Sequence, residues 1–235
     1  MNRSPVVLVL VALLGLSACA SFVGGPWGIS RWHSHHQGSM TSDSLSTSRL
    51  LELVHQYYPA NLRDSEEGYV ESAQYQRLLR ARQDALKNSG PWEHLVSKLT
   101  ETLPGCRVED WSVLFSNDNC WRVRVYLPDV RQLEDGGQEV RAIVVLVSIL
   151  APVYVRYTSS RKLVGRRWEE TKLFYEDVPE TKPHADKVEA LVRSELGVRP
   201  LPHDTLFTQV PDIQCRNTSL GRAQLIDCLF TDDRW

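Results

Sequence analysis

The sequence lacks an apolar run long enough to cross a bilayer as a helix. Such a helix needs ~20 consecutive apolar residues. The N-terminal run covers only residues 6–14, and the internal run AIVVLVSILAPVYV at 142–155 is also too short and contains Pro152. Because the internal run is rich in β-branched residues, it predicts a central strand, a bend at Pro152 and an adjoining strand.

The sequence also lacks an excess of charge of one sign. It has 27 Lys and Arg residues against 29 Asp and Glu residues, a formal net charge of −2. A chain with this balance has no global attraction for nucleic acid or for anionic lipid. Nucleic acid is therefore not an expected partner.

Local signatures of catalysis and of metal binding are missing. The chain has no G-x-S-x-G, H-E-x-x-H, P-loop or G-x-G-x-x-G motif. Ser159 and Lys162 match S-x-x-K, but the S-D-N and K-T-G motifs that accompany it in penicillin-binding enzymes are absent. No two cysteines have C-x2-4-C spacing and no His lies close to Cys106, Cys120, Cys215 or Cys228, so we expect neither a metal site nor a cofactor.

The N-terminus has the order of an export signal. Arg3 precedes the apolar run, and small residues lead to Leu16-Ser17-Ala18-Cys19. This tetrapeptide resembles the lipobox of bacterial lipoproteins. The resemblance implies that residues 1–18 are a signal peptide removed by cleavage and that Cys19 carries the lipid. A simple secretory signal that happens to contain a cysteine is the alternative.

The same resemblance implies a location in the bacterial cell envelope. Lipoproteins of this class carry a diacylglyceryl thioether on the cysteine and usually an acyl chain such as palmitate on its amino group, and two or three chains anchor a protein durably. Ala20 follows Cys19 where an Asp would favour the inner membrane, which implies the outer membrane, facing the periplasm or the cell surface, in a Gram-negative host. Residues 19–48 are rich in Gly, Ser and Thr and predict a flexible tether. We expect residues 49–235 to form a single globular domain.

Four cysteines follow the lipobox, an even number in a chain expected to enter an oxidising compartment. Two disulfide bonds are therefore predicted. Cys215 and Cys228 form the favoured pair, because a hairpin that turned near Gly221 would place them opposite one another. A bond between Cys106 and Cys120 requires the strand between them to bend, so pairing of either one with the C-terminal cysteines remains open.

The hydrophobic pattern predicts an α+β domain. Four segments have apolar residues at helical spacing: one capped by Thr47 or Ser48 and ended by Pro59, and others over 65–87, 91–103 and 183–196 with Gly197 as C-cap. Strands are predicted at 111–115, at 121–127 with one solvated face, within 142–155, at 167–175 and at 223–230. This order predicts an antiparallel β-meander sheet covered on one face by three to four helices.

One predicted hairpin concentrates positive charge. If residues 153–160 pair with residues 167–175, the basic side chains at or near the tip are Arg156, Arg161, Lys162, Arg166 and Arg167. A local patch of this kind steers association with an acidic protein or an anionic polymer even when the net charge is near zero. A solvated turn that protects an edge strand from aggregation is the alternative.

These features predict a non-catalytic protein-binding module on a lipid anchor. The order of helices and meander, with the C-terminal GRAQLIDCLFTDDRW, resembles immunity proteins that neutralise polymorphic or contact-delivered bacterial toxins. The resemblance implies toxin neutralisation and transfers no site residues, and an accessory role in toxin delivery or envelope assembly remains open. The second class is an envelope hydrolase with dispersed catalytic residues, which predicts a deep pocket where His55, His94, His184 or His203 meets a carboxylate or a Ser.

Overall fold

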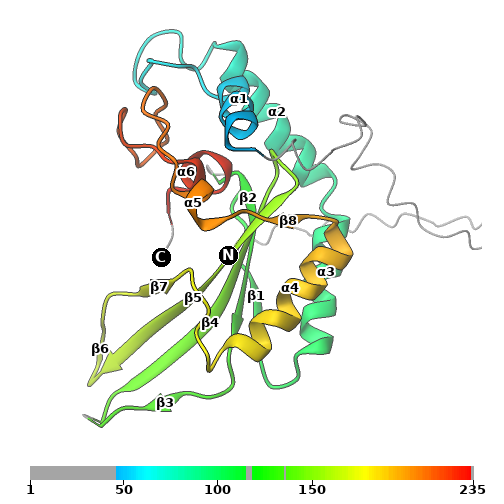
Figure 1. The fold of residues 1–235 in the computed structure, drawn as a ribbon, viewed down its shortest axis with the longest axis vertical. Helices are drawn as coiled ribbons and strands as arrows, with labels where there is room; N and C mark the ends of the chain where they lie inside the picture. The colour runs from blue at the N-terminus through cyan, green and yellow to red at the C-terminus, as the bar shows by residue number, and fades with distance from the viewer. Residues whose placement is uncertain (1–45, 115–117, 135, 234–235) are drawn as a thin grey trace, which may run out of the picture. The chain divides into compact units, whose positions relative to one another are not determined.

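The computed structural model describes residues 46–114, 118–134 and 136–233 (Figure 1). Cys19, the predicted signal peptide and residues 19–45 of the predicted tether lie outside these ranges. Ser42–Trp235 forms one compact unit. None of the helices in the described part of the chain combines the length and the apolar character that crossing a membrane requires.

The chain begins with three helices, α1 (Thr47–Tyr57), α2 (Ala73–Lys87) and α3 (Gly90–Thr102). The Ser46 and Ser72 hydroxyls cap α1 and α2 by accepting hydrogen bonds from backbone N–H groups in the first turn. The α1 cap therefore lies one residue before the two predicted candidates. The second helix begins eight residues later than predicted, because residues 66–72 form turns and Gly68 has a φ of 88°.

The sheet has the strand order β1-β2-β4-β5-β6, with antiparallel neighbours. Three short strands pair with the central ones: β3 with β4, and β7 and β8 with β5, the last of these in parallel. The apolar run supplies parts of β4 and β5 and turns near Pro152, as its composition predicts. The strands are β1 (Arg107–Asp110), β2 (Cys120–Tyr126), β3 (Arg131–Gln132), β4 (Gln138–Ser148), β5 (Val153–Val164), β6 (Arg167–Trp168), β7 (Lys172–Phe174) and β8 (Arg199–Pro200).

Apolar side chains are buried on both faces of the central strands. Along β4, Ile143, Val145 and Val147 pack in one cluster with residues of α3 and of α4 (Lys182–Leu196), which ends at Gly197 in left-handed backbone. The alternate residues Val144 and Leu146 pack in a second cluster with residues of α1, α5 (His203–Leu206) and α6 (Leu225–Leu229). The α+β class is confirmed, and the helices are divided between the two faces instead of covering one.

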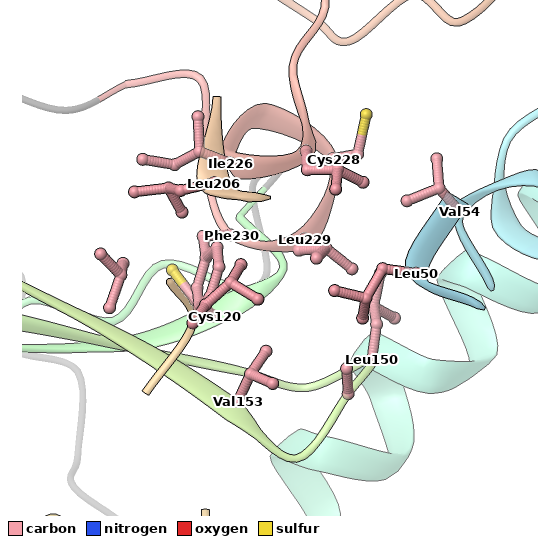
Figure 2. Packing of buried hydrophobic residues seen from close by; sticks show 14 of the residues in the cluster. Leu50, Val54, Cys120, Leu150, Val153, Leu206, Ile226, Cys228, Leu229 and Phe230 are labelled. Carbon is pink, nitrogen blue, oxygen red and sulfur yellow. The ribbon is translucent and has the colours of Figure 1, made fainter. Parts of the chain in front are cut away.

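The segment predicted as a strand at 223–230 contains helix α6 instead. All five residues of the helix are buried, and the Gln224 and Asp227 side chains form a reciprocal capping box at its start. Figure 2 shows Leu229 toward Leu50 of α1, Ile226 beside Leu206 of α5 and Phe230 beside Cys120 of β2, all within one apolar cluster. Because the helix is buried on all sides, its sequence shows no polar face whose period would have distinguished helix from strand.

The strand predicted at 111–115 lies earlier in the chain, at 107–110. Val108 pairs with Val125 and Asp110 with Val123, and the ladder extends by one hydrogen bond from the Trp111 N–H to the Arg122 carbonyl. The strand that pairs with β2 is therefore the charged segment RVED. The alternation of apolar residues at 111–115 indicated the wrong segment.

The predicted solvated face of β2 is buried. The Arg122 and Arg124 side chains lie on the same side of the strand, and each residue is less than a tenth exposed. Arg122 donates to the Asp118 carboxylate over 2.9 Å and to the Asp233 carbonyl over 2.8 Å, and the Arg124 guanidinium lies 4.3 Å from the centre of the Trp111 ring. Charged residues in this strand therefore take core positions because they have partners there.

Candidate functional site: a basic hairpin that carries an exposed tryptophan

The end of β5 and the short strand β6 form a tight hairpin. Leu163 pairs with Trp168 and Val164 with Arg167, so Gly165 and Arg166 make the turn. Gly165 has a φ of 61°, a backbone conformation that glycine adopts without steric cost. We call residues 161–168 the basic hairpin, and Figure 1 shows it at the end of the sheet far from α1 and α2.

Four of the five predicted basic residues belong to this hairpin. Arg161, Arg166 and Arg167 are exposed and Lys162 is half-buried. The pairing of β5 with β6 and β7 confirms the predicted hairpin and brings these four side chains to one end of the sheet. The hairpin is followed by Glu169 and Glu170, which are exposed and reduce its positive charge.

Arg156 does not belong to the hairpin, which corrects the sequence prediction. It lies eight residues before Val164, a distance of roughly 26 Å along a strand that rises ~3.3 Å per residue. Its guanidinium Nε donates to Glu189 on α4 over 2.7 Å, and its Nη2 donates to Asp177. The hydrogen bond from Arg156 holds the pKa of Asp177 below its usual range. Arg156 therefore fastens β5 to α4 and to the segment before it.

The hairpin exposes apolar surface together with charge. The described residues include six exposed large hydrophobic side chains, and three of them, Val164, Trp168 and Phe174, are on β5, β6 and β7. Trp168 is 46% exposed, and the Arg161 guanidinium lies 5.1 Å from the centre of its ring. Tryptophan and arginine are both enriched among the residues that dominate the energetics of protein interfaces. Sequence reasoning found the charges and missed Trp168, which is inside the same segment.

A buried carboxylate fixes the base of the hairpin. Glu139 pairs across the strands with Lys162 and accepts hydrogen bonds from Ser160 over 2.6 Å and from Arg141 over 2.9 Å. Burial alone would raise the pKa of Glu139, but these hydrogen bonds outweigh it and hold the pKa below its usual value. The carboxylate is therefore ionised at neutral pH, and it keeps the base of the hairpin ordered.

The structure brings together one of the predicted cysteine pairs. The Sγ atoms of Cys215 and Cys228 lie 3.4 Å apart, in contact as two thiols. The contact joins a loop to α6, whereas the sequence prediction placed the two cysteines on opposite strands of a hairpin. A disulfide bond between these two cysteines stays a prediction.

The other two cysteines are far from one another. Cys106 directly precedes β1, and the first residue of β1 pairs with Tyr126, which is the last residue of β2. Cys120 is the first residue of β2 and therefore lies at the opposite end of that strand. About 20 Å of strand separates these ends. Cys120 and Cys228 belong to one apolar cluster but occupy separate places in it (Figure 2). A bond between Cys106 and Cys120 is therefore incompatible with the register of the sheet.

Three of the four candidate histidines lie within 4 Å of a carboxylate. His55 forms a hydrogen bond with its carboxylate, whereas the contacts of His94 with Glu195 and of His203 with Asp204 are longer and involve exposed histidine side chains. The Nε2 atom of His55 lies 2.8 Å from Asp212 Oδ2, and its Nδ1 lies 2.7 Å from the Leu51 carbonyl, which only accepts hydrogen bonds. Burial lowers the pKa of His55, but the hydrogen bonds to Asp212 and Leu51 outweigh it and raise the pKa. Both ring nitrogens of His55 are therefore engaged within the protein, Nδ1 with the Leu51 carbonyl and Nε2 with the Asp212 carboxylate.

The other three candidate histidines have different surroundings. His94 is 3.6 Å from Glu195 with an exposed side chain, and His203 packs against the Phe207 ring at 4.7 Å between centroids. His184 lies on α4 with its Nδ1 atom buried. None of the four lines the cavity of about 90 Å³ between α2 and the C-terminal segment. This cavity therefore differs in its lining from the histidine-containing pocket that the hydrolase alternative predicts.

Sequence reasoning missed that cavity altogether. Its walls come from residues 58–82 and 215–232, so no local motif connects them. Groups of three or more His, Cys, Asp or Glu side chains with a geometry suited to a metal ion are absent from the described residues. Comparison with known proteins adds no assignment: no family model, curated protein or solved structure matches this chain.

Proposed function

We propose that this protein is a lipid-anchored lipoprotein of the bacterial envelope that acts as a non-catalytic protein-binding module. Its membrane attachment rests on the lipobox at Cys19. Its binding surface is the basic hairpin, and its partner is a protein with an acidic surface. Neutralisation of a bacterial toxin is the specific role that we propose, and an accessory role in toxin delivery or envelope assembly is the alternative.

The observation that carries this proposal is the environment of Trp168. A large aromatic side chain is left 46% exposed, with one arginine against its ring and further basic side chains within the same turn. Trp and Arg contribute most to binding when a partner surrounds them and excludes water. The basic charges favour an acidic partner by accelerating encounter, and the ordered base at Glu139 lowers the conformational cost of binding.

The binding surface is tested by site-specific photo-crosslinking in intact membranes. A photoreactive residue at position 166 is expected to give a discrete protein adduct, and the substitution Trp168→Ala is expected to abolish it. The matched control carries the photoreactive residue at position 80, an exposed arginine on α2. Equal adducts from positions 166 and 80, or an adduct that persists in Trp168→Ala, would exclude the hairpin as the contact surface.

The anchor and the specific role need separate tests. Labelled palmitate is expected to enter the wild-type chain and not a Cys19→Ser variant, and equal labelling of the two contradicts lipidation. For toxin neutralisation, the exported chain is expected to relieve the toxicity of a toxin-like protein encoded directly beside it, while the variants Trp168→Ala and Arg161→Ala are expected to relieve it less. If the exported, acylated chain fails to rescue, the immunity role is wrong.

A further inference from the structure

A small cavity lies at the other end of the domain from the basic hairpin. It has a volume of about 90 Å³, and its lining residues come from α2, the segment that precedes α2 and the C-terminal region. Polar and aromatic side chains dominate its walls. They are Tyr58, Asp64, Tyr69, Tyr75, Arg82, Cys215, Arg216, Asp227 and Asp232, and Leu78 is the one aliphatic side chain.

The inner wall of the cavity holds charged groups in fixed positions. Arg82 and Asp227 are more than nine-tenths buried. The Arg82 Nε donates to Asn119 Oδ1 over 2.9 Å, and one Asp227 carboxylate oxygen accepts from the Gln224 N–H over 2.9 Å. Asn119 in turn donates to the Tyr58 hydroxyl and to the Cys228 carbonyl. Burying both charges is costly, and a fold retains such groups only where they are well placed.

The rim of the cavity carries charges of both signs as well. Asp64 and Arg216 are exposed there, while Asp232 accepts hydrogen bonds from the backbone N–H and the side chain of Asn217. Gln214 donates to Asp64 over 2.9 Å, and the Asn61 N–H donates to the Asp212 carbonyl over 2.7 Å. These bonds tie the segment before α2 to the C-terminal loop, so that the two walls are held together.

The tyrosines supply neutral hydrogen-bonding groups and apolar surface. The Tyr69 and Tyr75 rings lie 5.1 Å apart. Burial, together with nearby negative groups that include Asp64, raises the pKa of Tyr69, so its hydroxyl keeps its proton throughout the physiological range. A protonated phenol donates one hydrogen bond and accepts others, and its ring packs against short aliphatic groups.

From these walls we infer that the cavity is a binding site for a small zwitterion, an α-amino acid of the size of glycine or alanine. Two guanidinium groups suit a carboxylate, and three carboxylates suit an ammonium group. The volume sets the size, because it is smaller than the ~150 Å³ of an engineered cavity that holds the six carbons of benzene. A nucleotide or a sugar is too large. This inference is independent of the basic hairpin.

The test measures binding of three probes to the full chain, purified in detergent, by ligand-observed NMR and calorimetry. Alanine carries both charges, ethylammonium only the positive one and propionate only the negative one. We expect saturable binding of alanine at least tenfold tighter than either singly charged probe. Equal binding of alanine and ethylammonium would overturn the inference in favour of a simple cation site, and no saturation by millimolar alanine would overturn it outright.

Two rim substitutions sharpen the test because the side chains are exposed and remote from the core. Arg216→Gln and Asp64→Asn each remove one charge and are each expected to weaken alanine binding by roughly two- to fivefold, the range of a partly solvated ion pair. Arg216→Gln is expected to tighten ethylammonium binding, and Asp64→Asn to tighten propionate binding. Glu67→Gln, on the same segment but away from the cavity, is the matched control and should change none of these affinities.

The thermal unfolding midpoint of each variant identifies any loss of binding that comes from unfolding. Loss of alanine binding in the Glu67→Gln control to the same degree as in the two rim variants would overturn the inference. The same holds if one rim variant weakens alanine binding while the other strengthens it, because a zwitterion needs both charges of the site.

Discussion

Arg156 and Arg161 are five residues apart on the same strand and have opposite environments. Arg156 is held by Glu189 and Asp177 against α4, with its side chain 12% exposed. Arg161 lies in solvent over the ring of Trp168. The difference shows that β5 changes role along its length: residues 153–160 are almost all buried core positions, and from Arg161 onward the strand presents side chains to solvent.

Arg122 on β2 extends this comparison to a fully buried arginine. It forms an ion pair with Asp118 in which both side chains are less than a tenth exposed. Burial raises the pKa of Asp118, and the opposing effect of Arg122 does not fully offset it. Burial lowers the pKa of Arg122, but negative neighbours that include Asp118 outweigh it and raise the pKa, so the pair favours the charge of the arginine more than that of the aspartate. Buried ion pairs as a class repay only part of their desolvation cost. We therefore expect substitutions of Arg122, Arg156 and Arg161 to have three different effects.

The largest loss of stability is expected for Arg122→Ala. It leaves the Asp118 carboxylate buried without its cation, which costs about 3–5 kcal/mol of unfolding free energy. Urea unfolding measures this loss. The double variant Arg122→Met/Asp118→Leu is expected to recover most of it, because neither charge is then buried. A double variant as unstable as the single one would show that the ion pair itself is a strong net stabiliser.

A smaller loss is expected for Arg156→Ala. Its partners Glu189 and Asp177 are nearer to solvent than Asp118, so the carboxylates can be rehydrated once the arginine is gone. We expect a decrease of about 1–2 kcal/mol, below the middle of the range for a hydrogen bond to a charged group because these carboxylates stay partly solvated. If Arg156→Ala instead left stability unchanged and abolished the photo-crosslink at position 166, Arg156 would belong to the binding surface after all.

Arg161→Ala is expected to have little effect on folding and a clear effect on binding. The exposed contact with Trp168 contributes about 0.5–1 kcal/mol at most, so the urea midpoint should move only slightly. Crosslinking through position 166 should nevertheless decrease, because the tryptophan loses its support. A large stability loss with unchanged crosslinking would reverse the assignments of Arg156 and Arg161.

The smallest effect is expected from the half-buried pair of His55 and Asp212. Because the pKa of His55 is raised on folding, its contribution is complete below the usual value of 6.5 and is lost as the pH rises through the folded-state value. Solvent screens this pair, so we expect the unfolding free energy to fall by a few tenths of a kcal/mol over this range. Asp212→Asn should remove that pH dependence, and an unchanged pH profile in this variant would contradict the assignment.

The comparison of the arginines also shows where sequence analysis succeeds. The hairpin was predictable because its signal is local: apolar segments flank a turn that contains glycine, and its basic residues follow directly. The length of β5 was not predictable, because the alternation of apolar and polar residues stops at residues 158–160. There Thr158, Ser159 and Ser160 are buried through contacts with residues of distant segments, such as Thr181 and Glu139. Because the predicted strand ended at residue 160, Arg156 was placed too near the tip of the hairpin.

The sequence by itself determined the α+β class, the central strands on either side of Pro152, helices α3 and α4 and the charge of the hairpin, because each depends on a periodicity or a turn residue within about a dozen positions. Tertiary structure alone decided the burial of Arg122, the helical form of residues 225–229 and the cavity beside α2. Each of these depends on which distant segment supplies the partner. A buried polar or uniformly apolar segment takes its conformation from those contacts, and local sequence does not encode them.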